Sequence, residues 1–243
     1  MVEPYFTREG ACIIATARGL ISLSQETLTS AIIDKKLAIK SFKNAPLLEK
    51  SYTAYGPIFQ IARDIVALQI SETSLLLNNS QKAASIDFKS PGIVTSDGQG
   101  SLCIASMDDE VSLYTVNQDN GELQLGDTCT FKKNLRNPTQ IIFKTMEPGV
   151  SYIVITGGIS NKKFELIAVE RTTATPLLQK SYMLSNEESI KKIFWPNFGD
   201  QPLIITDSLN TVHVINTKAF RYLALSAFYQ RAPSKKRKEL ESQ

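Results

Sequence analysis

His213 is the single histidine of the chain and lies in the sequence TVHVIN. Histidine is the side chain best suited to act as a general base or a metal ligand near neutral pH. One histidine is too few for a histidine-based metal site, although it would suffice for a catalytic dyad. Because His213 alternates with Val212 and Val214, we expect a strand in which the imidazole lies on the face opposite the two valines. This pattern favours a solvated or hydrogen-bonded strand histidine over a catalytic one.

Three adjacent carboxylates, Asp108, Asp109 and Glu110, are the next candidates, because calcium prefers several oxygen ligands. Neighbouring residues cannot all point at one ion without a second ligand-bearing loop, so a charged turn is the simpler interpretation. The glycines in TSDGQGS and at Gly157 and Gly158 lack the Lys-Ser/Thr pair of a phosphate-binding loop and predict β-turns. The sequence therefore predicts no metal and no cofactor.

The cysteines and the overall charge indicate the compartment. Cys12, Cys103 and Cys129 show no paired short spacing, which predicts free thiols in a reducing environment. A net charge of +3, from 27 basic and 24 acidic residues, does not by itself imply a nucleic-acid surface. No apolar stretch reaches the roughly 18 to 20 residues that span a bilayer, and the N-terminal sequence is unlike a secretory signal. We expect a soluble, intracellular protein without a membrane partner.

Residues 231–243 are polar and charged, without apolar periodicity, and are expected to form a flexible tail. Lys235, Lys236, Arg237 and Lys238 form an uninterrupted basic run that resembles a single-cluster nuclear localisation signal. The resemblance implies an import receptor as a partner and a nuclear protein, with a cytoplasmic location as the alternative. A weak RNA contact and a solubilising end remain alternative interpretations of the run.

A near-duplicated segment reveals how the chain is organised. Residues 46–52 read PLLEKSY and residues 176–182 read PLLQKSY, so that six of seven positions are identical across a separation of 130 residues. One third of this separation is about 43 residues, which is within the range for propeller blades of the WD-repeat type. The duplication predicts three repeat periods between the two copies.

Five pairs of short apolar runs support this period, each pair separated by turn-forming residues typical of β-hairpins. They are CIIATARGLISLS, IVALQISETSLLLN, LCIASMDDEVSLYTV, YIVITGGISNKKFELIAV and LIITDSLNTVHVI. Each hairpin extends to a four-strand unit. In the third unit, LQLGDTCTF is the fourth strand after a turn at Asn120 and Gly121. In the last unit, SIKKIFW is interpreted as the first strand rather than a helix, and FRYLALSAF as the fourth strand.

The predicted fold is an all-β propeller over residues 1–230, with about five four-stranded blades and six as the alternative. Most such rings need more blades, so the sequence also suggests an open arc or a ring that a partner completes. Trp195 and Phe198, in FWPNFGD, are candidate partner contacts if they are exposed, because aromatic residues dominate many interfaces. Packing of these aromatic residues between adjacent blades is the favoured alternative.

Residues 105–114, ASMDDEVSLY, resemble the blade signature of WD-repeat propellers, small-Ser-any-Asp-any-any-Val-any-Leu-Trp. Asp108 matches the turn aspartate of that signature, and Tyr114 stands where the family has tryptophan. The resemblance implies a structural role for Asp108, which would hydrogen-bond across a turn within its blade. The last unit departs from the signature, with Leu209 at the aspartate position and Ile215 at the tryptophan position.

A second resemblance suggests a different function. VSLYTVNQDNGELQL is similar to a hairpin segment of lactonase-type propellers, which are hydrolases with polar groups converging on a central channel. Such a set of groups cannot be assembled from this sequence. We therefore expect a non-catalytic protein-interaction scaffold, a subunit of a nuclear assembly such as one concerned with ribosome production or chromatin. The lactonase-type hydrolase remains the alternative.

Overall fold

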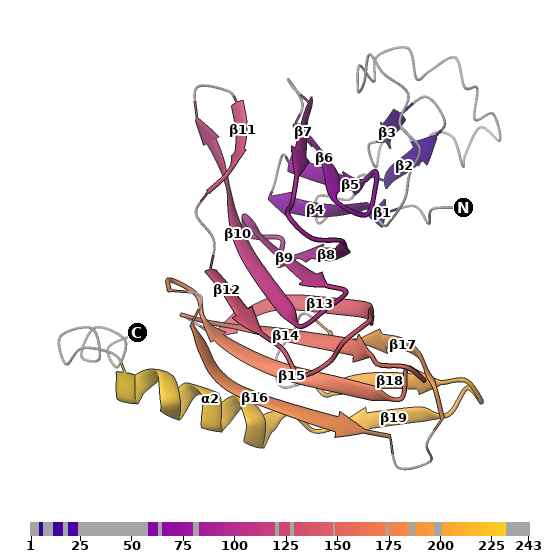
Figure 1. The fold of residues 1–243 in the computed structure, drawn as a ribbon, viewed down its shortest axis with the longest axis vertical. Coiled ribbons are helices and arrows are strands. Elements are labelled where there is room, and N and C mark those ends of the chain that lie inside the picture. The colour runs from indigo at the N-terminus through magenta and orange to yellow at the C-terminus, as the bar shows by residue number, and fades with distance from the viewer. Residues whose placement is uncertain are drawn as a thin grey trace. The chain divides into compact units, whose positions relative to one another are not determined.

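A computed structural model describes residues 5–6, 12–16, 19–23, 58–62, 65–79, 83–119, 122–126, 129–147, 149–173, 175–184, 188–196 and 201–231. Within these residues the chain forms five antiparallel sheets and one helix (Figure 1). All five predicted hairpins are present. The contacts divide the chain into two compact units, which are described in turn.

The first unit contains two sheets, each built from consecutive strands. One comprises β1 (Tyr5–Phe6), β2 (Cys12–Thr16) and β3 (Gly19–Leu23), and the other β4 (Ile58–Ala62), β5 (Ile65–Gln69), β6 (Ser74–Asn79) and β7 (Ala83–Asp87). Leu75, Leu76 and Leu77 are consecutive in β6 and all buried. Because successive side chains of a strand point to opposite faces, both faces of this sheet are covered at β6. PLLEKSY lies outside the described residues.

The third sheet confirms the predicted strand order, with one refinement. It comprises β8 (Gly92–Ser96), β9 (Ser101–Ser106), β10 (Glu110–Asp119), β11 (Glu122–Leu125) and β12 (Cys129–Lys132). The predicted fourth strand, LQLGDTCTF, is divided into β11 and β12, which pair with opposite ends of β10. At the division the Gly126 N–H donates to the Thr115 carbonyl at 2.7 Å. The turn expected at Asn120 and Gly121 lies outside the described residues.

The fourth sheet is the centre of the second unit. Its strands are β13 (Pro138–Glu147), β14 (Val150–Gly157), β15 (Lys163–Glu170) and β16 (Pro176–Met183), paired in chain order. PLLQKSY opens β16, which confirms it as the fourth strand of its blade. Every residue of β14 is buried, so both faces of this sheet are covered.

The last sheet has three strands where the sequence predicted four. It comprises β17 (Ile190–Phe194), β18 (Leu203–Asp207) and β19 (Val212–Ile215). The prediction of a fourth strand at FRYLALSAF was wrong, because residues Lys218–Arg231 form the helix α2. Phe220, Ala224 and Phe228 recur every fourth residue and are the buried side chains of α2, as a helix requires.

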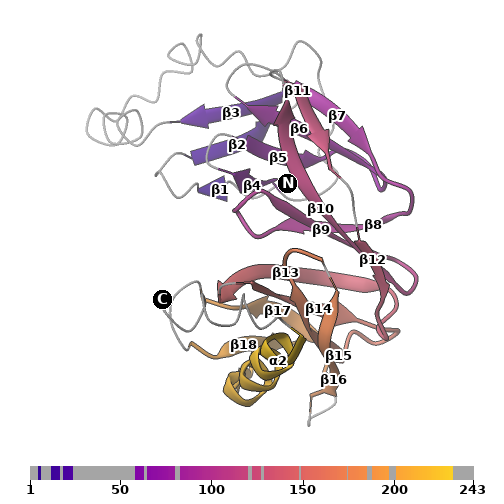
Figure 2. The ribbon, with the colours of Figure 1, turned by 90° about the vertical axis from the view of Figure 1, so that its left-hand side faces the viewer.

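Two covering layers enclose the β13–β16 sheet within the second unit. On one face, side chains of β14 such as Ile153 and Ile155 pack with Cys103 and Val111 of the third sheet. On the other face, Tyr152 and Val154 pack with β17, β18 and α2. Figures 1 and 2 show α2 and the β17–β19 sheet on this same side of β14–β16. The two elements therefore form a single layer, which we call the β17–α2 layer.

Two polar contacts fix where α2 lies. At its start, Asn216 Oδ1 accepts a hydrogen bond from the Lys218 N–H at 3.0 Å. This Asx turn caps the first helical N–H from the residue before the N-cap Thr217, whose carbonyl accepts from the Arg221 N–H at 2.9 Å. Further along, the Arg221 guanidinium donates through Nε to Glu147 Oε1 of β13 at 2.6 Å, and both side chains are largely shielded from water. The cap favours a helix at this point of the chain, and the ion pair ties that helix to the central sheet.

Replacing Asn216 with alanine should lower the free energy of unfolding of the second unit by about 1 kcal/mol, because the hydrogen bond that caps the Lys218 N–H is lost. Asn216→Ser keeps an oxygen that can cap the helix and should stay within about 0.5 kcal/mol of the parent. Urea unfolding followed by the fluorescence of Trp195, the single tryptophan, measures both values. Equal losses in the two variants would show that the Asn216 side chain does not cap α2.

Candidate protein-interaction surface

The turn between β9 and β10 carries the residues that resemble the WD-repeat signature. Ser106 Oγ accepts from the Glu110 N–H at 3.0 Å and donates to the Glu110 carbonyl at 3.1 Å. The side chain of Asp108 is exposed, and its backbone carbonyl accepts from the buried Lys133 ammonium. Tyr114 lies on β10 and is half-buried. The hydrogen bonds across the turn thus come from Ser106 rather than from the carboxylate of Asp108.

The corresponding turn of the last blade is closed by Asp207, which is fully buried. Its Oδ1 accepts from the Leu209 N–H at 3.0 Å and the Thr211 N–H at 2.8 Å, and its Oδ2 lies 2.9 Å from His213 Nε2. The expected hydrogen-bonded strand histidine is therefore present. Sequence reasoning missed Asp207, although a carboxylate before an Asn-Thr turn was a usable signal for a side chain that closes a turn.

A second buried carboxylate, Glu165 of β15, holds the segment that connects the third and fourth sheets. Its two oxygens accept from the Asn134 side-chain amide at 2.8 Å, the Asn134 and Leu135 N–H groups at 3.2 Å, and Gln179 Nε2 at 2.7 Å. Burial lowers the pKa of Lys133 next to this segment, and the charges of Asp109 and Glu165 act in the opposite direction. Glu165 could have been recognised in the sequence as a candidate buried carboxylate, because it is a charged residue inside the apolar run KFELIAVE.

The described residues contain no group of three or more His, Cys, Asp or Glu side chains that could hold a metal ion. Among them, Cys103 is a buried free thiol and Cys129 is a half-buried one. Burial, together with the nearby charge of Asp97, raises the pKa of Cys103 well above its ordinary value. Because the thiolate is the reactive form, this environment makes Cys103 a poor nucleophile.

Cys103 should therefore react with iodoacetamide at least about tenfold more slowly than Cys129 in the folded protein, because its side chain is fully buried from the reagent and burial disfavours its thiolate. In urea the two thiols should react at similar rates. Mass spectrometry of the labelled peptides at pH 8 reports each site. Rapid native labelling of Cys103 would contradict the burial of this side chain.

Trp195 is 1% exposed and belongs to the core of the second unit. Its ring meets that of Tyr152 edge-on, with centroids 6.0 Å apart, and its Nε1 donates to the Gln201 carbonyl at 3.3 Å. Trp195 therefore packs between the fourth and fifth sheets, which is the alternative favoured from the sequence. It is not available on the surface to contact a partner. Phe198 and the basic run Lys235, Lys236, Arg237 and Lys238 lie outside the described residues.

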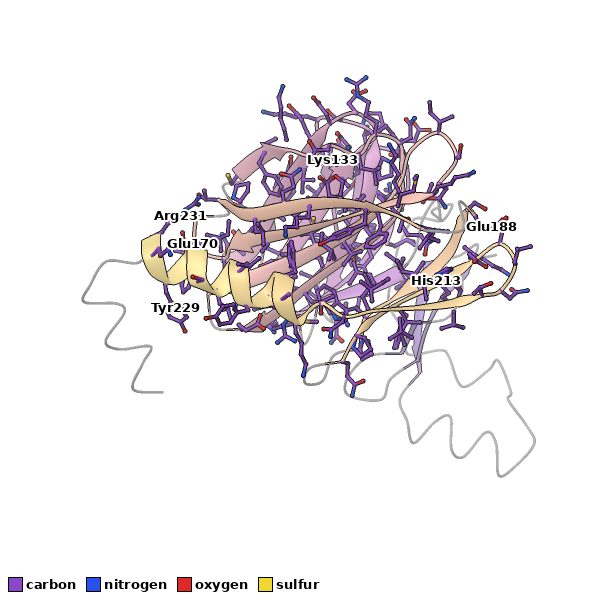
Figure 3. The ribbon with its side chains drawn as sticks, turned by 90° about the horizontal axis from the view of Figure 1, so that it is seen from below. Lys133, Glu170, Glu188, His213, Tyr229 and Arg231 are labelled. Atoms are coloured by element: carbon purple, nitrogen blue, oxygen red, sulfur yellow. The ribbon has the colours of Figure 1, made fainter. Side chains whose placement is uncertain are left out.

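The outer surface of the β17–α2 layer exposes large apolar side chains from both of its parts. On the sheet these are Phe194, Val212 and Val214, between 57% and 65% exposed, with Leu209 at the turn. On α2, Tyr222 is 74% exposed and is accompanied by Leu223 and Tyr229. We call these seven residues the outer face. In Figure 3, α2, where Tyr229 is labelled, and β19, where His213 is labelled, lie on the side of the second unit that faces the viewer.

No family model matches the chain, and neither does any curated protein. Among solved structures, it is similar to BBS1N, crystallised in complex with ARL6DN, at 9% identity and a TM-score of 0.55. It is also similar to Saccharomyces cerevisiae Sqt1, at 12% identity and a TM-score of 0.50. The similarity covers 87% and 70% of this chain. The fold is that of a WD-repeat-like β-propeller.

The five sheets within the described residues agree with the predicted count of about five blades and with an all-β class, apart from α2. The chain spans 63% of the length of BBS1N and 50% of that of Sqt1. A WD40 domain of SCAP from fission yeast is similar over 89% of this chain and 47% of its own, at 14% identity and a TM-score of 0.45. Within the described part of the propeller, no helix is long and apolar enough to cross a membrane.

Proposed function

We propose that this propeller is a non-catalytic scaffold that binds other proteins as a subunit of a nuclear assembly. The observation that carries the proposal is the outer face, where large apolar side chains are exposed along the β17–β19 sheet and along α2. Large exposed apolar surfaces often mark sites of protein interaction. His213, the side chain best suited to chemistry in the sequence, has a structural partner in Asp207.

The nuclear part of the proposal depends on Lys235, Lys236, Arg237 and Lys238. An import receptor reads such a run in an extended conformation, which suits the predicted tail at residues 231–243. Assemblies concerned with ribosome production or chromatin are the proposed setting. Residues 1–230 form the binding domain in this scheme.

Localisation of a tagged chain tests the nuclear assignment. The protein has a mass of 26.9 kDa and could diffuse through nuclear pores, so the tag must be a large, passive fluorescent cargo. Replacing the four basic residues with alanine should move the signal to the cytoplasm. The matched control replaces Lys235, Lys236 and Lys238 with arginine, keeps the charge, and should remain nuclear. An alanine variant that stays nuclear would contradict the assignment.

Purification of the intact chain from nuclear extract tests the scaffold assignment. We expect one or more proteins to co-purify in fixed stoichiometry and to resist competition by unrelated protein. Metal-dependent hydrolysis of a lactone by the purified chain would overturn the non-catalytic assignment. Recovery of the chain alone, with no stoichiometric partner, would overturn the scaffold assignment.

A further inference from the structure

We propose that the outer face binds a segment of a partner protein whose apolar side chains are flanked by carboxylates. This inference rests on the proposed scaffold function and deepens it, because it assigns the binding surface and the chemistry of the partner. Three features support it: the apolar pattern of α2, the exposed outer face of the β17–β19 sheet, and the charges around both.

Helix α2 is apolar on two sides. Phe220 and Phe228 face the core, whereas Tyr222 and Tyr229 project outward together with Leu223. A surface helix normally carries polar residues on the side away from the core, and a helix that is apolar all round is normally covered all round. The apolar side chains on the outward side of α2 therefore indicate that a second partner packs against this side of the helix.

The β17–β19 sheet has the same asymmetry. Phe194, Ile204 and Val214 are register partners across the three strands and form one row on the sheet. The residues adjacent to Phe194 in the chain, Ile193 and Trp195, are buried, so this row occupies the opposite, outer face. In the neighbouring β13–β16 sheet, apolar residues on both faces of β14 are buried under other elements. The outer row is apolar in the same way, but no described element covers it.

The described charges near the outer face are mostly basic. Between residues 190 and 231 the described residues contain one carboxylate, Asp207, which is fully buried and held by His213. Just before this stretch, Glu188 accepts a hydrogen bond from Ser208 Oγ at 2.6 Å and is the acidic side chain at the turn that carries Leu209. Lys192, Lys218 and Arg231 are exposed in the same stretch. Opposite charges across an interface steer association and favour the correct partner. A second copy of this chain would bring like charges together, so an acidic apolar segment of another protein is the better complement.

Binding of two labelled probe polymers to the full chain tests this proposal. The first is a random copolymer of glutamate and tyrosine, and the second is a random copolymer of lysine and tyrosine. The four basic tail residues are replaced with alanine in every sample, so that the tail does not contribute. We expect measurable binding of the glutamate copolymer, weakening with added salt because the contacts are charged, and no binding of the lysine copolymer.

The variants identify the surface. Val214→Ser and Tyr222→Ser, combined, remove one anchor from β19 and one from α2, and should weaken binding of the glutamate copolymer about tenfold or more. The matched control is Ile159→Ser, which removes an apolar side chain that is 101% exposed in the turn between β14 and β15. This control should leave binding unchanged. Circular dichroism and Trp195 fluorescence establish that all variants remain folded.

Several results would overturn the proposal. If Ile159→Ser weakens binding of the glutamate copolymer as much as the Val214 and Tyr222 substitutions do, the copolymer adsorbs non-specifically. If both copolymers bind equally well, the charge of the partner does not contribute to recognition. A dimer in light scattering that dissociates in the Val214 and Tyr222 variant would assign the face to a second copy. Binding to phosphatidylserine vesicles through Tyr222, without binding of the copolymer, would assign it to a membrane.

The proposed function can survive the failure of this inference. If the chain keeps a stoichiometric partner from nuclear extract when Val214 and Tyr222 are replaced, the scaffold function stands and the assigned surface is wrong. If neither the copolymer nor any partner binds, both proposals fail.

Discussion

Replacing Glu165 with alanine is expected to lower the free energy of unfolding of the second unit by about 3 to 5 kcal/mol. The Glu165 carboxylate is fully buried and accepts from Asn134, Leu135 and Gln179. Its removal leaves the buried Leu135 N–H and the partly buried Asn134 and Gln179 donors without their acceptor, and releases the segment that joins β12 to β13. Urea unfolding followed by Trp195 fluorescence measures the loss, because Trp195 lies in the core of the same unit.

Two further variants separate this effect from the loss of any charge on β15. Glu165→Gln keeps one acceptor oxygen and should cost less than the alanine variant. Glu170→Ala, at the far end of the strand, removes a carboxylate that accepts a solvent-exposed hydrogen bond from Thr173, and should cost no more than about 0.5 kcal/mol. A loss at Glu165 as small as that at Glu170 would show that the buried network does not hold the connecting segment.

Replacing Phe228 with alanine is also expected to cost about 3 to 5 kcal/mol, as other deletions of buried aromatic rings do. Phe228 is 3% exposed and packs onto the backbone at Gly149, where an added Cβ would lie 2.6 Å from Phe228 Cζ. The cavity left by the ring lies between α2 and β14, and the tight glycine contact disappears with it. The same urea titration measures this loss.

Tyr222→Ala is the matched control, because it removes an aromatic ring from the exposed side of the same helix. Its cost should be within about 0.5 kcal/mol of zero. The comparison also distinguishes a helix from the strand that the sequence suggested. In a strand, residues 222 and 228 would lie on one face and would respond alike, so equal losses would contradict the helix.

The strand pattern was determined by the sequence because it depends on neighbouring residues. Alternation and turn residues predicted all five hairpins, and the PLLQKSY copy is the fourth strand β16 of its sheet. The position of His213 on the sheet face opposite Val212 and Val214 followed from its alternation with these two valines. These features need only the local period of two residues that a pleated strand imposes.

Other features depended on residues far apart in the chain. Glu165 meets Asn134 from 31 residues away, and Trp195 meets Tyr152 of another sheet, so no local pattern could assign their partners. FRYLALSAF contains both an alternating period and a period of four, and packing onto β14–β16 selected the helix. The sequence by itself therefore determined the blades, whereas the tertiary structure decided which apolar side chains are buried and which form the outer face, because burial depends on how the sheets stack.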